Sequence, residues 1–486
     1  MFEFKKISKE GLRKGILQFN GKKRETPTYF MTSNFGGGGS DLYRIVTYLD
    51  LLERPSIPIL FNYYYLTVGG TVRIGWINHI PEFGDILEFI ASIREKFFEK
   101  GHVRKGYPRS KVNWLPITSL DSGSGNILRD ELKSGKISVD AFRERYEELI
   151  AQYHDFARTH RFNMVMAMDF ARKYTYKKGE RRDALYRKFS SQFSQDLSSN
   201  LQLLSLTLDC LKETETDAMI YAPARGATPQ QYEEYVGKVL ELERNKGMKF
   251  HGFALGGIVD YRSKNDEIWN VPPSASRRVK AGIIVMSGAR AIRRALERAK
   301  DHRPVHALGA GDVSNIIPLV VSGADTFDCH TPWRRATDGN KESAKFVFEK
   351  EIGGKFSKYL IPAIDSKSEV IVENKEELWN YVKLPEVPDD IVCDCDICRK
   401  FSIKEIKQLY SNLGEDYYFA RMLMYVHAIL QHDLLCKRLA ADIEEEHSVF
   451  DTVNEIPDED LRKDLLYILR FNPDSSKHTT LPGCFP

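Results

Sequence analysis

Eight short apolar runs, separated by longer helical or polar segments, restrict the fold of this sequence more than any other feature. Each run has the length of a strand that is buried on both faces. Segments between them, such as 229–246 and 289–300, have the apolar spacing of helices. Eight strands that alternate with helices predict a (β/α)8 barrel of the α/β class, with its active site at the carboxyl ends of the strands. The runs occupy residues 27–32, 57–66, 113–121, 162–169, 217–224, 249–257, 304–311 and 324–332.

The ends of these predicted strands carry residues that can form such a site. Asp328 lies in an otherwise apolar run, TFDC, where an unpaired carboxylate is costly. Any single aspartate at a strand end can equally be a helix N-cap or a partner in a loop salt bridge. Three aspartates that end three strands of one barrel favour a shared site. The strand-end candidates are Asn62, Asp121, Asp169, Arg225, Gly256, Gly257, Gly309 and Asp328.

The composition is typical of a large globular protein and limits the cellular locations that we expect for it. The 486 residues are 42% hydrophobic and 29% charged, and the formal net charge is only +3, so local basic clusters matter more than the sum. No stretch approaches the ~20 apolar residues of a membrane span. The first residues lack the apolar core of a secretory signal. We therefore expect a cytoplasmic protein with no membrane partner.

Three of the seven cysteines form a C-x-C-x-x-C cluster, Cys393, Cys395 and Cys398. Seven cysteines are too few for a disulfide scaffold in a chain of this length, whereas thiolates this close can bind one tetrahedral ion. The amphipathic segment that follows would return His427 to the cluster as fourth ligand. His432 is the alternative, but five residues along a helix it points in a different direction. Three thiolates and one imidazole predict one structural Zn²⁺. The alternative interpretation is a chance cluster of cysteines in a loop, which the spacing disfavours.

Several segments, in the same order along the chain, resemble the tRNA-guanine transglycosylase superfamily. The segment GADTFDCHTPWRRAT is similar to the family's nucleophile segment, LDSGSGN to its D-S-G-G segment and FALGG to its glycine pair. FNYYYL, HALGAG, the cysteine cluster, the following FSIKE and LMYVHA match further segments. The resemblance runs from about residue 11 to about residue 440. Eight segments matched in order are a specific signal, whereas any one of them alone is weak.

The resemblance implies an exchange of bases on an intact sugar by double displacement. Asp328 would be the nucleophile that forms a covalent intermediate, and Asp121 would act as general acid and then as general base. Arg334 and Arg335, just after the nucleophile, would contact the nucleic-acid backbone. The implied base-binding residues are Asp169, Ser122, Gly256, Gly257, Asn62 and Arg225.

Some pocket positions depart from the tRNA enzymes. The segment 121–126 lacks the family's aromatic residue, and the family's V-Q-G-G aligns with 223–226, where Arg225 cannot mimic the donor and acceptor of an amide. We therefore expect a different polymer or base. The favoured hypothesis is the DpdA-like branch, which places 7-cyano-7-deazaguanine into DNA in place of guanine. The alternative is a tRNA enzyme of queuosine or archaeosine type, although no RNA-binding PUA-type domain is evident at the C-terminus.

Basic clusters at 171–188 and 277–298 agree with a nucleic-acid partner, although most charge runs are solvated helix faces. The sequence leaves open whether a partner ATPase or helper protein takes part. A non-catalytic nucleic-acid-binding subunit is the alternative from another functional class, and the three retained aspartates argue against it. A barrel glycosidase is disfavoured because no sugar-binding aromatic platform is evident.

We expect three parts in the chain. Residues 1–385 would form the catalytic barrel, residues 386–440 a zinc-binding helical subdomain, and residues 441–486 a helical C-terminal extension. The extension is acidic and then helical, and it would cap the barrel or engage a partner protein.

Overall fold

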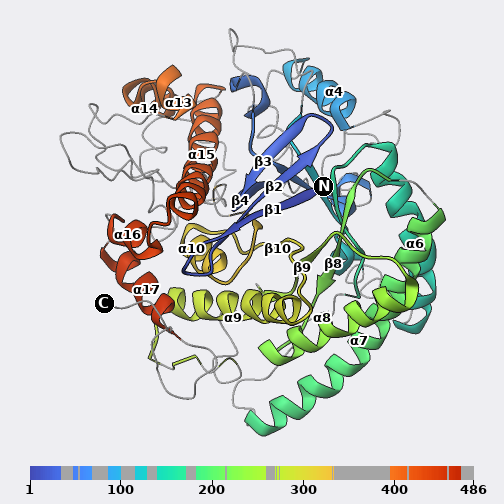
Figure 1. The fold of residues 1–486 in the computed structure, drawn as a ribbon. Coiled ribbons are helices and arrows are strands. Elements are labelled where there is room, and N and C mark those ends of the chain that lie inside the picture. Colours follow the sequence, from blue (N-terminus) through green and yellow to red (C-terminus); the bar gives the residue numbers. More distant parts are fainter. Residues whose placement is uncertain are drawn as a thin grey trace.

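A closed barrel of eight parallel strands forms the centre of the protein, and helices surround it (Figure 1). The strands pair in chain order, and the last strand closes the barrel against the first. All eight predicted strands are present, so the (β/α)8 prediction is confirmed. The computed structural model describes residues 1–33, 48–52, 55–67, 86–99, 115–127, 139–170, 182–213, 216–258, 269, 271–272, 274–330, 332, 395–412, 415–456 and 459–471.

The barrel strands are short and almost entirely buried. They are β4 Thr28–Ser33, β5 Ile59–Asn62, β6 Thr118–Asp121, β7 Met164–Met166, β8 Met219–Ala224, β9 Gly252–Leu255, β10 Val305–Ala307 and β11 Thr326–Cys329. The helices between them are α2 Tyr63–Thr67, α4 Ile86–Glu99, α6 Val139–Thr159, α7 Arg182–Glu213, α8 Pro229–Lys246, α9 Arg277–Arg298 and α10 Val313–Val321. No helix in the described ranges combines the length and apolar character that crossing a membrane requires.

Five strands end earlier than the apolar runs predict, and β5 and β10 show why. Within the run 57–66, β5 ends at Asn62 and the following residues form α2. The Asn62 side chain accepts a hydrogen bond from the backbone N–H of Tyr65 at 3.4 Å, as a residue at the start of a helix commonly does. The run 304–311 leaves β10 after Ala307, because Gly309 adopts φ 66°, in the left-handed region. Both breaks lie at the end of the barrel where the candidate residues gather.

An antiparallel sheet of three strands precedes the barrel, and the sequence analysis did not predict it. It comprises β1 Phe2–Ile7, β2 Arg13–Phe19 and β3 Lys22–Thr26. The signal was present: Asn20 and Gly21, with φ of 35° and 82°, form the two-residue loop typical of a hairpin.

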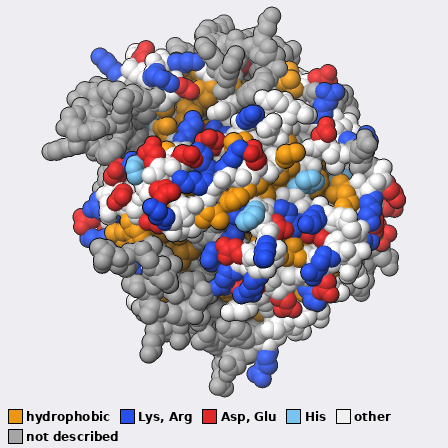
Figure 2. All heavy atoms as spheres, viewed as in Figure 1, with side chains coloured by type: hydrophobic (Ala, Val, Ile, Leu, Met, Phe, Trp, Pro, Cys, Tyr) orange, Lys and Arg blue, Asp and Glu red, His pale blue; other side chains and the backbone are white. Residues whose placement is uncertain are grey.

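The N-terminal sheet closes the amino end of the barrel. Leu17 and Phe19 of β2 pack in one apolar cluster with Met164 and Met219, which are the first residues of β7 and β8. In Figure 1 the sheet lies in front of the barrel. Positive and negative side chains are interspersed on this face (Figure 2). The sheet thus covers the amino end of the barrel, opposite the carboxyl ends of the strands where the candidate residues lie.

Helices that follow the barrel complete the fold. They are α13 Asp396–Lys400, α14 Ile403–Ser411, α15 Glu415–Glu445, α16 Val449–Asn454 and α17 Glu459–Arg470. The long helix α15 packs against β4, and α17 packs against α9 and α10. The expected domain boundary at residue 440 falls inside α15, which is one continuous helix. The division into three domains stays a prediction.

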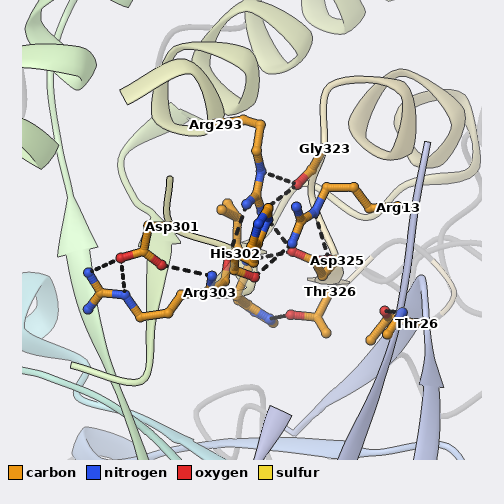
Figure 3. Close-up of polar contacts among 12 residues, drawn as sticks. Arg13, Thr26, Arg293, Asp301, His302, Arg303, Gly323, Asp325 and Thr326 are labelled. Carbon is orange, nitrogen blue, oxygen red and sulfur yellow. Dashed lines mark hydrogen bonds and ion pairs between the residues drawn. The ribbon is translucent and has the colours of Figure 1, made fainter. Parts of the chain in front are cut away.

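A buried ion network at the amino end of the barrel joins the N-terminal sheet to the last strands (Figure 3). The fully buried Asp325, just before β11, accepts hydrogen bonds from Arg13 Nε at 3.3 Å and Arg293 Nη2 at 2.9 Å. The same carboxylate accepts the backbone N–H of Val305 at 2.8 Å. Arg293 also donates twice to the carbonyl of Gly323. Each buried charge therefore has a partner, as low-polarity surroundings require.

This network corrects part of the expectation about the basic cluster at 277–298. Arg293 is fully buried, so it cannot contact nucleic acid. Arg294 and Arg298 form ion pairs with Glu233 on α8, at 2.6 and 2.7 Å. These three arginines attach α9 to the body of the protein, so the inference from their charge alone was wrong for Arg293.

Arg293→Met is expected to lower the free energy of unfolding by about 3–5 kcal/mol, because it leaves Asp325 buried without one of its two cationic partners. Denaturant unfolding followed by circular dichroism measures the change. Arg290→Met on the same helix is the control: its pair with Glu297 is solvent-exposed, and its loss should cost under about 1 kcal/mol. Equal losses in the two variants would contradict a special role for the buried network.

Candidate active site and metal cluster

Three aspartates lie at the end of the barrel formed by the carboxyl ends of its strands. Asp121 is the last residue of β6, Asp169 follows β7 by three residues, and Asp328 is the third residue of β11. The charges of Asp169 and Asp328 both act on the carboxyl group of Asp121. The prediction that the strand ends bring these residues together is therefore supported by the structure.

Asp121 lies in surroundings that favour its protonated form. Loss of surrounding water raises the pKa of Asp121 to about 7, and the charges of Asp169 and Asp328 act in the same direction. Asn62, next to Asp121 in the strand register, donates from Nδ2 to Oδ2 at 2.6 Å and partly offsets the rise. A carboxyl group with a pKa near neutrality can donate a proton in one step and accept one in the next.

Asp169 is held by a partner on each carboxylate oxygen. Ser124 Oγ donates to Oδ1 at 2.5 Å, and Arg225 Nη1 donates to Oδ2 at 2.9 Å. The hydroxyl of Tyr146 on α6 donates to the Asp169 backbone carbonyl at 3.1 Å. Sequence reasoning missed Ser124, because a serine between two glycines has no distinctive pattern. Ser122 is buried, and its hydroxyl accepts the backbone N–H of Ser124 at 3.3 Å.

Arg225 lies along the glycine pair that follows β9. A Cβ atom at Gly257 would lie 3.1 Å from Arg225 Nη2, and one at Gly256 would lie 3.6 Å from Nη1. Gly257 also has φ 75°, which side chains rarely adopt. The hydroxyl of Tyr232 fixes the Gly256 carbonyl at 2.7 Å. The glycines thus leave space beside their backbone, and the guanidinium of Arg225 uses that space.

Two nitrogen atoms lie within hydrogen-bond distance of the Asp328 carboxylate. Its Oδ1 accepts the backbone N–H of Gly309 at 2.9 Å and faces His306 Nε2 at 3.1 Å. The backbone N–H of Gly311 donates to the Asp328 carbonyl at 2.7 Å, and a Cβ at Gly311 would lie only 3.1 Å from that group. The side chain is 4% exposed. Sequence reasoning missed His306, although a histidine inside an apolar strand run was a usable signal.

A second cluster, formed by Cys395, Cys398 and His427, lies beside the barrel. Both sulfur atoms are 3.2 Å from His427 Nδ1, and all three ligand atoms lie within 4.8 Å of one another. Two sulfurs and one imidazole nitrogen at this spacing can hold a metal ion. His432 instead bonds to the carbonyl of Ala428 at 2.8 Å and packs on Tyr29. The structure thus brings His427, and not His432, to the two cysteines, and the role of His427 as a metal ligand stays a prediction.

Comparison with known proteins agrees with both clusters. The family described as Queuine tRNA-ribosyltransferase (TGT) matches residues 165–448, more than half of the chain. The chain belongs to this family. The matched range includes Asp169, Asp328 and the Cys395, Cys398 and His427 cluster. Within the superfamily, membership of the DpdA-like branch stays a prediction.

One similar protein is the queuine tRNA-ribosyltransferase of Roseiflexus sp. (strain RS-1). It is 29% identical over 116 residues, which are 23% of this chain. The aligned part spans only 22% of that relative. The tRNA substrate in its name is therefore a property of the relative, and the substrate of this transglycosylase-family protein is a separate question.

Three predicted site residues lie outside the described part of the chain: Arg334, Arg335 and Cys393. The basic stretch 171–181 also lies outside it. The roles given to these residues stay predictions, as do the roles of the base-binding residues whose positions are described above.

Cys395→Ser and His427→Ala are each expected to reduce bound metal well below about one ion per chain, because each removes a ligand of the same ion. Elemental analysis of the purified protein measures the content, and thermal unfolding should begin at a lower temperature. Cys210→Ser, a cysteine outside the cluster, and His432→Gln should keep the metal. Loss of metal in His432→Gln and retention in His427→Ala would refute the ligand assignment.

Proposed function

We propose that the protein is a base-exchange transglycosylase that replaces guanine in DNA with a 7-deazaguanine, 7-cyano-7-deazaguanine, through a covalent aspartyl-nucleoside intermediate. The observation that carries the proposal is the contrast between two carboxyl groups at the same end of the barrel. Asp328 accepts the backbone N–H of Gly309 and faces His306, so one of its oxygen atoms is fixed in place. Asp121 has a pKa near 7 and can carry a proton. A nucleophile and a general acid are the two groups that base exchange requires.

In the first step, a carboxylate oxygen of Asp328 forms a bond to the anomeric carbon while the bond from that carbon to guanine breaks. The electron pair of the broken bond goes to guanine, which takes a proton from Asp121. In the second step the ionised Asp121 takes a proton from the incoming base. A nitrogen of that base attacks the same carbon, and the electron pair of the ester bond returns to Asp328. Two inversions retain the configuration of the sugar.

Arg225 stands in the base pocket where the tRNA enzymes have a glutamine, and this difference favours a different base or polymer as substrate. Asp169 would accept N–H groups of the base, while Arg225 offers only donors. Donors of Arg225 suit acceptor atoms on the ring or on a substituent at position 7, such as the nitrogen of a nitrile. Asn62, Ser122, Gly256 and Gly257 would complete the pocket at the ends of β5 and β9 and in the loop after β6.

The choice of DNA rests on these departures in the pocket. The second candidate function is exchange in tRNA, which the name of the Roseiflexus relative favours. In a DNA duplex the target nucleotide must be flipped out of the stack before a nucleophile inside a barrel can reach it. Arg334 and Arg335 would bind the flanking phosphates. A helper protein or partner ATPase and a cytoplasmic location are part of the proposal.

A zinc ion fits the metal cluster, with Cys393, Cys395, Cys398 and His427 as ligands. Four protein ligands would leave no open position on the ion. The ion would therefore hold α13 and α15 together and would take no part in base exchange.

The test is incorporation of radiolabelled guanine by the purified protein into single-stranded DNA, duplex DNA and tRNA. We expect incorporation into DNA, which Asp328→Asn abolishes because the amide cannot form the ester intermediate. Asp396→Asn, an exposed aspartate on α13, is the matched control and should exchange at the unaltered rate. Incorporation into tRNA alone would replace DNA with tRNA. Binding of nucleic acid without exchange would favour the non-catalytic subunit.

The pH dependence gives a second test. Formation of the covalent complex in a single turnover should slow as the pH rises through about 7, because Asp121 then loses the proton that guanine needs. The hydrogen bond from Asn62 favours the ionised carboxylate, so Asn62→Ala should raise the pKa of Asp121 and move the decline to higher pH. Asp121→Asn should form little complex at any pH. An unchanged or lower midpoint in Asn62→Ala would contradict the assignment of Asp121.

A further inference from the structure

We propose that His306 is a positioning residue that fixes Asp328 so that Oδ2 is the reacting atom, and that it stabilises the Asp328 carboxylate when the intermediate breaks down. This inference rests on the proposed function for its chemical consequence. Its structural basis is independent of that function, because it concerns hydrogen bonds inside the barrel. His306 lies in the middle of β10 and is 0% exposed.

Both ring nitrogens of His306 face oxygen atoms of the neighbouring strand β11. Nδ1 lies 2.8 Å from Thr326 Oγ1, and Nε2 lies 3.1 Å from Asp328 Oδ1. The register pairs His306 with Thr326, so the three side chains point to the same side of the sheet. Phe30 on β4 meets the imidazole edge-on, with ring centroids 5.4 Å apart and planes at 87°. The ring is thus enclosed by β4 and β11.

We assign one arrangement of protons to this group. An ionised Asp328 carboxylate only accepts hydrogen bonds, so Nε2 carries the proton that Oδ1 receives. With a neutral imidazole Nδ1 is the acceptor, and the hydroxyl of Thr326 donates to it. Thr326 thereby stabilises the tautomer that the carboxylate requires. A buried network in which each member is satisfied is also rigid.

The consequence for Asp328 is a difference between its two oxygen atoms. The hydrogen bonds to its carboxylate within the described residues both fall on Oδ1, from Gly309 and His306. Oδ2 is therefore the oxygen available to bond to the anomeric carbon. When that ester bond breaks, its electron pair returns to the carboxylate, and the two N–H donors stabilise the charge that reappears. His306 moves no proton in either step.

The main test compares His306→Phe, which loses both hydrogen bonds, with His306→Gln, which keeps an N–H donor. In His306→Phe, decay of the trapped covalent complex after addition of free base should slow about 10- to 100-fold, as expected for one lost hydrogen bond to a charged group. The KM for the base should stay the same, and His306→Gln should recover part of the rate. His154→Phe, a buried histidine on α6, is the control and should decay at the unaltered rate.

Thr326→Val provides a second variant of nearly the same shape. It should slow decay by removing the donor to Nδ1, yet it should have almost no effect in the His306→Phe background, because Thr326 acts through the ring. Unaltered decay in His306→Phe, or additive losses in the double variant, would overturn the proposal.

A readout without activity separates this proposal from the proposed function. In protein labelled with ¹⁵N-histidine, the His306 resonances, assigned by their loss in His306→Gln, should be those of a neutral ring protonated at Nε2. Thr326→Val should disturb them. A doubly protonated ring or an Nδ1 proton would overturn the inference about His306. The expected resonances in a protein that exchanges no base would instead refute the proposed function alone.

Discussion

The Asp325 carboxylate is the contact on which the arrangement of the site depends. It lies three residues before Asp328, at the opposite end of β11, and it binds Arg13 of the N-terminal sheet and Arg293 of α9. It also accepts the backbone N–H of Val305, which begins β10. One buried anion thus fixes where β10 and β11 start. Because strands this short are nearly straight, the same contact also determines the positions of His306 and Asp328 farther along these strands.

Four aspartates of the barrel differ in their surroundings, and the differences divide their roles. Two guanidinium groups balance Asp325, and Asp169 is paired with Arg225. Asp328 has the Gly309 N–H and the His306 imidazole as partners in place of a cation. Burial and the charges of Asp169 and Asp328 raise the pKa of Asp121 to about 7, although the Asn62 amide acts in the opposite direction. Neither Asp328 nor Asp121 is paired with a guanidinium group, and both lie on the carboxyl-end side of barrel strands.

The pair formed by Arg225 and Asp169 connects the fold to substrate choice. Its geometry needs the glycine pair after β9, because a side chain at Gly257 would approach the guanidinium closely. An arginine here adds fixed donors to a pocket that already contains acceptors. The family match gives the type of chemistry, whereas this pair gives a physical reason to expect a different base or polymer. The metal cluster is separate, since α15 carries His427 on the outer side of β4.

The sequence by itself predicted the eight strands, their order, the aspartates at their ends and a candidate metal cluster that includes Cys395, Cys398 and His427. Those features depend on periodicity and residue type over short stretches, which folding does not alter. Strand lengths were overestimated, because apolar runs continue into turns at Asn62 and Gly309. Only the tertiary structure decided that Arg293 is an internal counter-ion, that Arg225 binds Asp169 and that His306 faces Asp328. Those contacts join residues on different strands and helices. Arg13 and Asp325, for example, are 312 positions apart in the sequence, and no local sequence pattern specifies a contact between residues so widely separated.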